Sequence, residues 1–251
     1  MVEEHPIFNA PENENVKVWR YMDFTKLISL IDTRRLFFSR ADMFDDPFEG
    51  SYPKINVEAR SLHPEDITDE GKQNYLELMN KMGDINKQWP RYIAISCWHM
   101  NEFESAAMWS LYLKSNEGIA VQSTFKKLKK SIIDDEKVYL GVVKYIDYEN
   151  DKINGGNILG PFVHKRKSFQ HERELRGLIM KWPTGSEKVN FEEETIIGGI
   201  PIKVDLEELI EKIYVAPNAP SWFAKLVKTA VKRYGYDIEV IHSEMNNEPM
   251  F

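Results

Sequence analysis

One short run of alternating charged residues has a spacing that can serve chemistry. The run extends from Gln170 to Arg176 (QHERELR). If a strand begins near Glu172, then Glu172, Glu174 and Arg176 share one face, because successive side chains of a strand point to opposite sides. Two carboxylates about 7 Å apart along a strand can stabilise a cationic transition state. If the run is helical instead, Glu172 and Arg176 form an ordinary ion pair. The apolar residues that follow favour the strand.

An arginine near the N-terminus lies at the end of another predicted strand. Residues 16–22 (VKVWRYM) alternate and are rich in residues that favour strands. Arg20, between Trp19 and Tyr21, could present its planar guanidinium to a phosphate or a carboxylate. The alternative is a surface arginine on an edge strand.

A third run combines a small hydroxyl with a large aromatic ring. Residues 92–98 (YIAISCW) are the most strand-like stretch of the chain. Alternation places Ser96 and Trp98 on one face, where they can form a shelf for a flat ring with a hydrogen bond at its edge. Cys97 points the other way, and a lone buried cysteine is more often a packing residue than a nucleophile.

An acidic loop offers oxygen ligands. Asp45, Asp46 and Glu49 lie close together in sequence and, with the glutamate pair, could bind Mg²⁺. A capped turn explains the Asp-Asp-Pro run equally well. The six histidines lack the spacings typical of zinc sites. We therefore expect no metal cofactor.

The composition limits the classes of protein to which the chain can belong. It has 251 residues, 42% of them hydrophobic and 29% charged, and 33 basic against 40 acidic residues leave a formal charge of −7. These fractions exclude wholesale disorder, and a single cysteine excludes a disulfide framework. We expect no signal peptide and no membrane helix, hence a cytoplasmic protein. Net acidity argues against broad binding to duplex nucleic acid.

The predicted elements favour an α+β fold. Strands and helices mix without regular βαβ alternation, which indicates mixed, largely antiparallel sheets with flanking helices. We predict one domain over residues 16–251, a loose arm over 1–15, and a helical insert near 51–90. Residues 162–171 are predicted to form a basic helix, and a basic helix is usually a solvated face.

Four runs together resemble a widespread bacterial family, catalogued as domain of unknown function number 2971. The runs are WRYMDFTKLISLIDTRRLFFSRADMFDDPFEG, ISCWHMNEFESAAMWSLYLKSNEGIAVQ, KSFQHERELR and VIHSEMNNEP. The resemblance covers roughly residues 16–249, nearly the whole chain. The chain departs from the family pattern at Asp45, where the family usually carries asparagine. The family name implies no activity.

A second resemblance implies chemistry. An arginine on a first strand, a serine on a later strand and Glu-x-Glu opening another strand are similar to the Arg–Ser–Glu class of ADP-ribosyltransferases. An ADP-ribosyltransferase-like fold is therefore one form that the α+β architecture could take. The resemblance implies that Arg20 binds the phosphates of NAD and that Ser96 supports the nicotinamide ribose. It further implies that Glu174 holds a ribose hydroxyl and activates the acceptor, with Glu172 as the acceptor-side carboxylate.

The predicted site follows from these runs. Glu174 and Glu172 are the predicted catalytic residues, and NAD is the predicted substrate. The predicted NAD-binding residues are Arg20, Tyr21, Ser96, Trp98, Trp109 and Tyr112. The chain departs from the transferase pattern at Cys97 and Trp98, where that class usually has small hydroxyl residues.

Three functions remain open from the sequence. The first is an NAD-consuming ADP-ribosyltransferase or NAD glycohydrolase, a candidate toxin or defence effector with an unknown protein or nucleic-acid acceptor. The second is a metal-dependent nuclease that uses the acidic loop and the glutamate pair. The third is a non-enzymatic sensor or interaction module in which the same residues form a partner face.

Overall fold

A mixed sheet runs through the computed structural model, which describes residues 1–62, 68–112, 116–183 and 190–246. Eight of its strands follow in the order β1-β6-β9-β4-β2-β5-β11-β12, and β3 and β10 branch from β4. These ten strands are β1 (Val2–Glu3), β2 (Lys17–Asp23), β3 (Arg35–Arg40), β4 (Ile93–Met100), β5 (Gly118–Thr124), β6 (Val138–Val142), β9 (Glu174–Met180), β10 (Gly199–Lys203), β11 (Lys212–Val215) and β12 (Glu239–His242).

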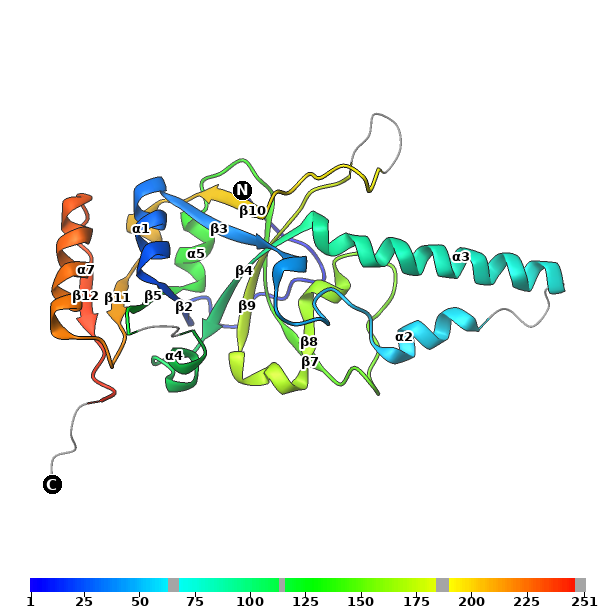
Figure 1. The fold of residues 1–251 in the computed structure, drawn as a ribbon, viewed down its shortest axis with the longest axis horizontal. Coiled ribbons are helices and arrows are strands. Elements are labelled where there is room, and N and C mark those ends of the chain that lie inside the picture. The colour runs from blue at the N-terminus through cyan, green and yellow to red at the C-terminus, as the bar shows by residue number, and fades with distance from the viewer. Residues whose placement is uncertain (63–67, 113–115, 184–189, 247–251) are drawn as a thin grey trace, which may run out of the picture.

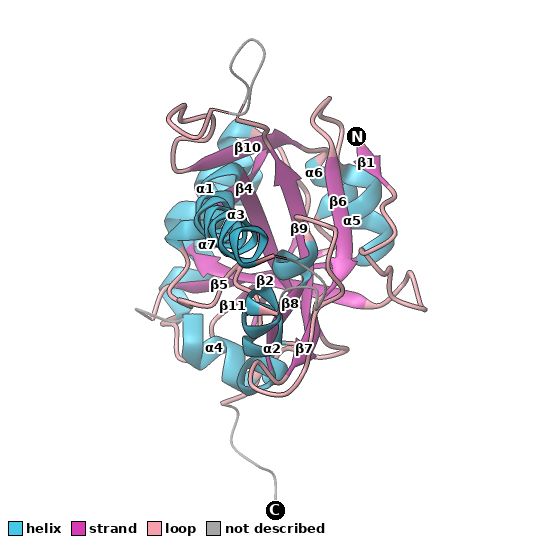
Figure 2. Cartoon of the chain, turned by 90° about the vertical axis from the view of Figure 1, so that its right-hand side faces the viewer, coloured by secondary structure: helices cyan, strands magenta, loops and turns pink. Residues whose placement is uncertain are grey.

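Most strand pairs are antiparallel. The parallel pairs are β1 with β6, β11 with β12, and a separate pair of β7 (Lys144–Ile146) with β8 (His164–Arg166). The helices are α1 (Phe24–Thr33), α2 (Lys54–Glu58), α3 (Asp69–Gln88), α4 (Ala106–Tyr112), α5 (Phe125–Ser131), α6 (Leu206–Leu209) and α7 (Ser221–Arg233). Seen end-on, α1 and α7 lie on one side of the strands and α5 and α6 on the other (Figure 2). The predicted α+β class with a mixed, largely antiparallel sheet is confirmed.

The sheet forks at β4. Strand β9 pairs along one edge of β4, from Ile93 to His99. On the other edge, β3 pairs only near Ala94 and Ile95, whereas β2 pairs only with His99 and Met100. Residues 96–98 therefore lie where β2 and β3 separate. From this fork β2 leads to β5, β11 and β12, and β3 leads to β10.

Helix α1 shows how local sequence sets an element that borders the fork. Asp23 caps its N-terminus by accepting a hydrogen bond from the Lys26 backbone N–H at 2.8 Å. Leu27, Leu30 and Ile31 form its buried stripe. Arg34 ends the helix in the left-handed conformation with φ of 54°. The sharp turn at Arg34 brings β3 back toward β4.

Helix α3 projects from the body of the molecule (Figure 1). Thr68 caps it by accepting from the Gly71 backbone N–H, and acidic residues follow in its first turn. None of its 20 residues is buried. Residues 51–90 thus hold α2 and α3, and the limits of a single domain over 16–251 stay a prediction. Within the part of the chain that the structure describes, no helix combines the length and apolar character needed to cross a bilayer.

The N-terminal segment is not the loose arm that its composition predicted. Its residues Val2 and Glu3 pair with β6 as an edge strand. Phe8 stacks on Tyr139 with ring centroids 5.3 Å apart, and the Phe8 backbone lies against Gly141. The prediction failed because the apolar residues of this polar segment find their partners more than a hundred residues away.

The predicted basic helix over residues 162–171 is also wrong. This stretch holds the end of a 3-10 helix (Gly160–Val163), then β8, then most of a second 3-10 helix (Lys167–Glu172). Lys165 lies in the middle of β8 and is 9% exposed. A lysine that was expected on a solvated face is therefore buried, which matters for the site below.

We predict that Gly141→Ala destabilises the protein by about 1–3 kcal/mol, because overpacking a close contact forces the backbone apart. A Cβ atom at Gly141 would lie 2.9 Å from the Phe8 Cα. Urea unfolding measures the change. The matched control is Gly155→Ala, whose Cβ meets nothing within 4 Å and should leave stability unchanged. Equal stability of the two variants would contradict the docked position of the N-terminal segment.

Candidate active site

Glu174 opens β9 at the end of the sheet that carries the fork. It lies opposite His99 of β4, is 2% exposed, and its backbone N–H donates to the Tyr145 hydroxyl at 2.8 Å. The residue before it, Arg173, has a left-handed φ of 41°. This turn ends the 3-10 helix, so Glu172 is not part of the strand as predicted. The two glutamates nevertheless reach a common partner.

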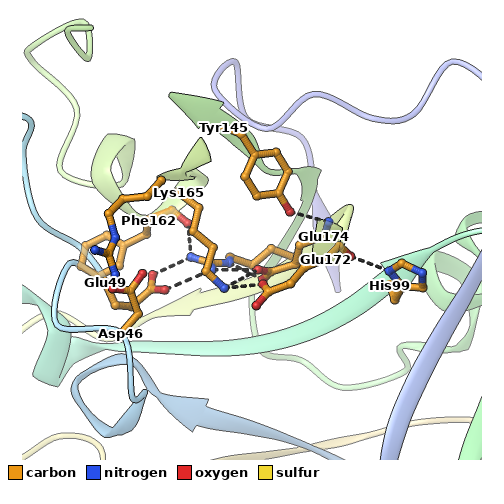
Figure 3. Close-up of polar contacts among 10 residues, drawn as sticks. Asp46, Glu49, His99, Tyr145, Phe162, Lys165, Glu172 and Glu174 are labelled. Atoms are coloured by element: carbon orange, nitrogen blue, oxygen red, sulfur yellow. Dashed lines mark hydrogen bonds and ion pairs between the residues drawn. The ribbon is translucent and has the colours of Figure 1, made fainter. Parts of the chain in front are cut away.

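That partner is Lys165 of β8. Its Nζ lies 2.5 Å from a Glu172 carboxylate oxygen and 3.5 Å from a Glu174 carboxylate oxygen, and it also lies over the Phe169 ring. Figure 3 shows Lys165 beside Glu172 and Glu174, with dashed lines for its contacts to their carboxylates. The charges of Glu174 and Glu172 outweigh the burial of the ammonium group and raise the pKa of Lys165. Lys165 is therefore a fixed positive charge in the site.

Arg176 is the second cation and is fully buried. Its Nε and one Nη donate to the two carboxylate oxygens of Glu174 at 2.7 and 3.1 Å. Both Nη atoms donate to Glu49, at 2.6 and 3.1 Å, and one also donates to the Phe162 carbonyl at 2.6 Å. A guanidinium has five N–H donors, and all five are used here. A charged group can be buried without a large cost in free energy when all its hydrogen-bond donors have acceptors.

The cluster joins three carboxyl groups to two cations. Glu49, Glu172 and Glu174 face Lys165 and Arg176. Burial raises the pKa of Glu49, so a formal excess of one negative charge holds only when this carboxyl is ionised. Burial alone would raise the pKa of Glu174. The opposing charges of Arg176 and Lys165 and the Arg176 hydrogen bonds instead lower it from 4.5 to about 2. A buried carboxylate is thus held ionised at neutral pH.

Arg20 bridges the fork in the sheet. One Nη donates to the Ser96 hydroxyl on β4, and the other donates to the Phe37 carbonyl on β3 at 2.8 Å. The guanidinium also lies 5.8 Å from the centroid of the Trp98 ring, and the Trp98 indole N–H donates to Ser96 at 3.2 Å. The predicted residues Arg20, Ser96 and Trp98 are therefore in mutual contact. Three of the five guanidinium donors remain for other partners.

The predicted aromatic residues form a second contacting group. The Tyr21 and Trp109 ring centroids lie 4.9 Å apart, edge to face, and Tyr112 stacks on Tyr21 at 6.3 Å. The Tyr21 hydroxyl accepts from the Ser105 backbone N–H at 2.8 Å, which anchors the start of α4. His99 lies next to this group, and its Nε2 is buried without a hydrogen-bond partner among the described residues.

The strand register decides how these groups relate. Cys97 lies opposite Arg176 and His99 opposite Glu174, so these four share one face of the sheet. Ser96 and Trp98, opposite Gly177 and Leu175, point to the other face. The serine and the tryptophan therefore do not lie on the face of Glu174.

Two side chains connect the groups. Tyr112 lies near enough to both groups to be affected by their charges: burial, and then the charges of Glu172 and Glu174, raise the pKa of Tyr112. Cys97 interacts with Arg20 and with Glu174, and burial beside this carboxylate raises the pKa of Cys97. Cys97 is therefore a neutral thiol rather than a nucleophile.

Two acids of the acidic loop that could serve as magnesium ligands have other partners. Asp46 accepts from Arg166 at 2.7 Å, and Glu49 binds Arg176. The structure also shows a cavity of about 790 Å³ between the acidic loop, α2 and α3. It is lined by Glu49, but by none of the eight predicted catalytic and NAD-binding residues. Whether those eight surround one substrate stays a prediction.

Several site residues were missed from the sequence. Lys165 was assigned to a solvated helix, Glu49 was considered only as a metal ligand, and Tyr145 was not singled out. The basic run His-Lys-Arg gave no local signal that Lys165 is buried. No local pattern could have shown that Glu49 binds an arginine 127 residues away.

The sequence was compared with protein-family models and with curated proteins. No protein-family model matches the chain, so the resemblance to family number 2971 is not confirmed. No curated protein matches it either.

Among solved structures, the chain is similar to DarT of Thermus sp. 2.9. The complex with NAD+ has a TM-score of 0.42 and 8% identity over 93% of this chain and 98% of that chain. The complex with ADP-ribosylated ssDNA has a TM-score of 0.41 and 8% identity over 94% and 98%. Likeness at this level does not establish a shared activity.

We predict that acid weakens the fold through Glu174. A carboxyl group whose pKa is lowered by folding stabilises the folded state at every pH above the pKa that the group has in the unfolded chain. This stabilisation is lost as the pH falls toward the folded-state pKa of about 2. The shift corresponds to about 3 kcal/mol at most. Urea unfolding between pH 7 and pH 2.5 should show stability falling below pH 5, and Glu174→Gln should flatten this dependence. The exposed-residue control Glu77→Gln should keep the wild-type profile. A wild-type slope in Glu174→Gln would contradict the assignment.

Proposed function

We propose that the protein consumes NAD, as an ADP-ribosyltransferase or an NAD glycohydrolase, with Glu174 as its charged catalytic residue. The observation that carries the proposal is the ionised, buried Glu174 within a cluster of three carboxyl groups and two cations. Fixed negative charge in a poorly solvated site stabilises a developing cation more strongly than water does. Cleavage of the bond between nicotinamide and ribose develops such a cation on the ribose.

The proposed step balances in charge and atoms. Nicotinamide leaves with the pair of electrons of its bond to the ribose C1′, and so becomes neutral. The oxocarbenium ion that remains is stabilised by the Glu174 carboxylate. An acceptor oxygen or nitrogen, or water in a glycohydrolase, then forms a bond to C1′ and loses a proton. Glu172, which Lys165 holds beside Glu174, is the proposed group to receive that proton.

The other predicted residues fit NAD in their chemistry. Arg20 retains three unused N–H donors, and a planar guanidinium suits phosphate oxygens. Tyr21, Trp109 and Tyr112 offer aromatic faces for a flat ring. Tyr112 is 47% exposed and interacts with Arg20 and with both glutamates. We therefore propose that NAD enters past Tyr112.

A binding module without catalysis is the second candidate. It is favoured by the enclosure of Glu174, whose side chain is 3% exposed and bound by two cations. In that case the Glu174 cluster is a structural ion network, and NAD or a partner is bound without turnover. Measuring binding and turnover separately distinguishes the two candidates.

The direct test is nicotinamide release from NAD. We expect release by the wild-type protein and a loss of about 100-fold or more in Glu174→Gln, because one electrostatic contact to a transition state contributes that much. Glu77→Gln, on the outside of α3, is the matched control and should retain the wild-type rate. Protein and single- and double-stranded nucleic acids are supplied as acceptors. Thermal unfolding verifies that each variant is folded.

The outcomes separate the candidates. Release that depends on Glu174 supports the enzyme. NAD binding without release, by calorimetry, supports the binding module. If NAD is neither bound nor cleaved with every class of acceptor present, NAD is not the ligand of the enzyme or of the binding module.

We predict that Arg20→Lys raises the KM for NAD at least about tenfold with a smaller effect on kcat, since a charge-assisted hydrogen bond contributes about 1.5–3 kcal/mol. A lysine cannot reproduce the bridge to Ser96 and Phe37 and still face a phosphate with a planar fork. The control is Arg35→Lys. Arg35 lies at the start of β3 and donates to the Pro201 carbonyl of β10, so this change should leave the KM for NAD unchanged. An unchanged KM in Arg20→Lys would rule out phosphate binding by Arg20.

A further inference from the structure

The cavity between the acidic loop and helices α2 and α3 is lined by none of the proposed catalytic and NAD-binding residues, and it shares only Glu49 with the Glu174 cluster. Its walls are formed by Pro47 and residues 49–52, by Val57 of α2 and the turn that follows, and by α3 from Leu76 onward. Its volume of about 790 Å³ lies in the range of about 300–1,000 Å³ that is typical of small-molecule sites. Glu49 is the residue of the Glu174 cluster that lines the cavity, and its carboxylate forms an ion pair with Arg176.

An arginine without an ion pair lines this cavity. The Arg60 guanidinium lies over the Tyr52 ring, 5.3 Å from its centroid, and both residues are part of the wall. Among the described residues, Arg60 has no carboxylate within ion-pair distance, whereas Lys87 on the same wall is paired with Asp84 at 3.0 Å. Stacking holds a guanidinium flat and leaves the N–H donors at its edge free. Within the part of the chain that the structure describes, the cavity therefore presents one positive charge without an ion-pair partner.

Helix α3 lies against that arginine. A Cβ atom at Gly83, in the interior of the helix, would meet Arg60 Nη1 at 3.5 Å, an ordinary van der Waals contact. The Arg60 guanidinium therefore lies between the Tyr52 ring and α3.

The rest of the lining combines apolar surface with amides. Val57, Leu76 and Met79 provide apolar contact, and Asn80 and Asn86 provide hydrogen-bond donors and acceptors. Val57 and Leu76 are 48% and 40% exposed, so apolar surface remains uncovered. A ligand that matches this wall has a flat or apolar body with polar edges and one anionic group.

We propose that this cavity binds a nucleoside monophosphate, with its phosphate on Arg60 and its base against Tyr52 and the apolar wall. A phosphate suits the free edge of a guanidinium, and a base offers a flat face together with polar edges for the two asparagines. The proposal does not depend on NAD consumption, because none of the proposed catalytic or NAD-binding residues lines the cavity.

Isothermal titration calorimetry with AMP and with CMP tests the proposal, and adenosine and inorganic phosphate are titrated separately. We expect a nucleotide to bind more tightly than either fragment. Arg60→Gln should weaken nucleotide binding at least about tenfold, as expected for the loss of a charge-assisted contact, and leave adenosine binding unchanged. Tyr52→Leu should weaken both the nucleotide and adenosine. The matched control Lys81→Gln changes an exposed cation of α3 outside the cavity and should have no effect.

Three outcomes would overturn the proposal. They are no nucleotide binding at millimolar concentration, equal binding to wild type and a folded Arg60→Gln variant, and equal losses in Arg60→Gln and Lys81→Gln. Arg60→Lys provides a second variant that keeps the charge but loses the planar fork, and it should also bind more weakly. The same titrations in Glu174→Gln separate this site from the proposed NAD site, because nucleotide binding should persist there.

Discussion

The buried guanidinium of Arg176 is the constraint on which the surrounding structure depends. Its five donors are divided among Glu174 of its own strand, Glu49 of the acidic loop and the Phe162 carbonyl. Removing one partner of a buried ion pair typically costs about 3–5 kcal/mol, because the remaining charge stays without compensation. The loop must therefore return to this point. It does so through Gly50, whose φ of 72° suits glycine, and a Cβ atom there would lie 2.3 Å from the Phe162 ring.

The fork in the sheet is the second constraint, and it explains why polar side chains gather at the same level. Where β2 and β3 separate, residues 96–98 lack a neighbouring strand on one edge. Arg20 spans this gap with one bond to Ser96 and one to the Phe37 carbonyl. A sheet that continued without a fork would bury this edge in backbone pairing and leave no room for a side chain. The contact of Arg20 with Ser96 and the ion cluster lie on opposite faces of β4. Cys97 and Tyr112 lie near the charges of Arg20 and of Glu174.

Local patterns predicted the elements better than the site. Helix α1 could be predicted because its buried stripe and its cap at Asp23 are local. The shared face of Glu174 and Arg176 follows from strand alternation and is present. Glu172 could not be placed, because the left-handed Arg173 that ends the 3-10 helix is a non-glycine residue with no sequence signal. Lys165 was misplaced for a different reason, since its burial depends on carboxylates that only the folded chain brings to it.

The excess of carboxyl groups over cations in the cluster is more informative than its ion pairs. A network built for stability alone would do best with balanced charges or with apolar residues of the same volume, because desolvation makes buried ions costly. Here Lys165 serves two carboxylates, and Arg176 serves Glu174 together with Glu49. Two cations hold three carboxyl groups close to one another, and burial together with the charge of Glu174 raises the pKa of Glu49. An additional positive charge that enters is stabilised by the Glu174 carboxylate, which stays ionised. A cation that exists only during a reaction would gain this stabilisation without tight binding of the neutral product, which is the condition for catalysis.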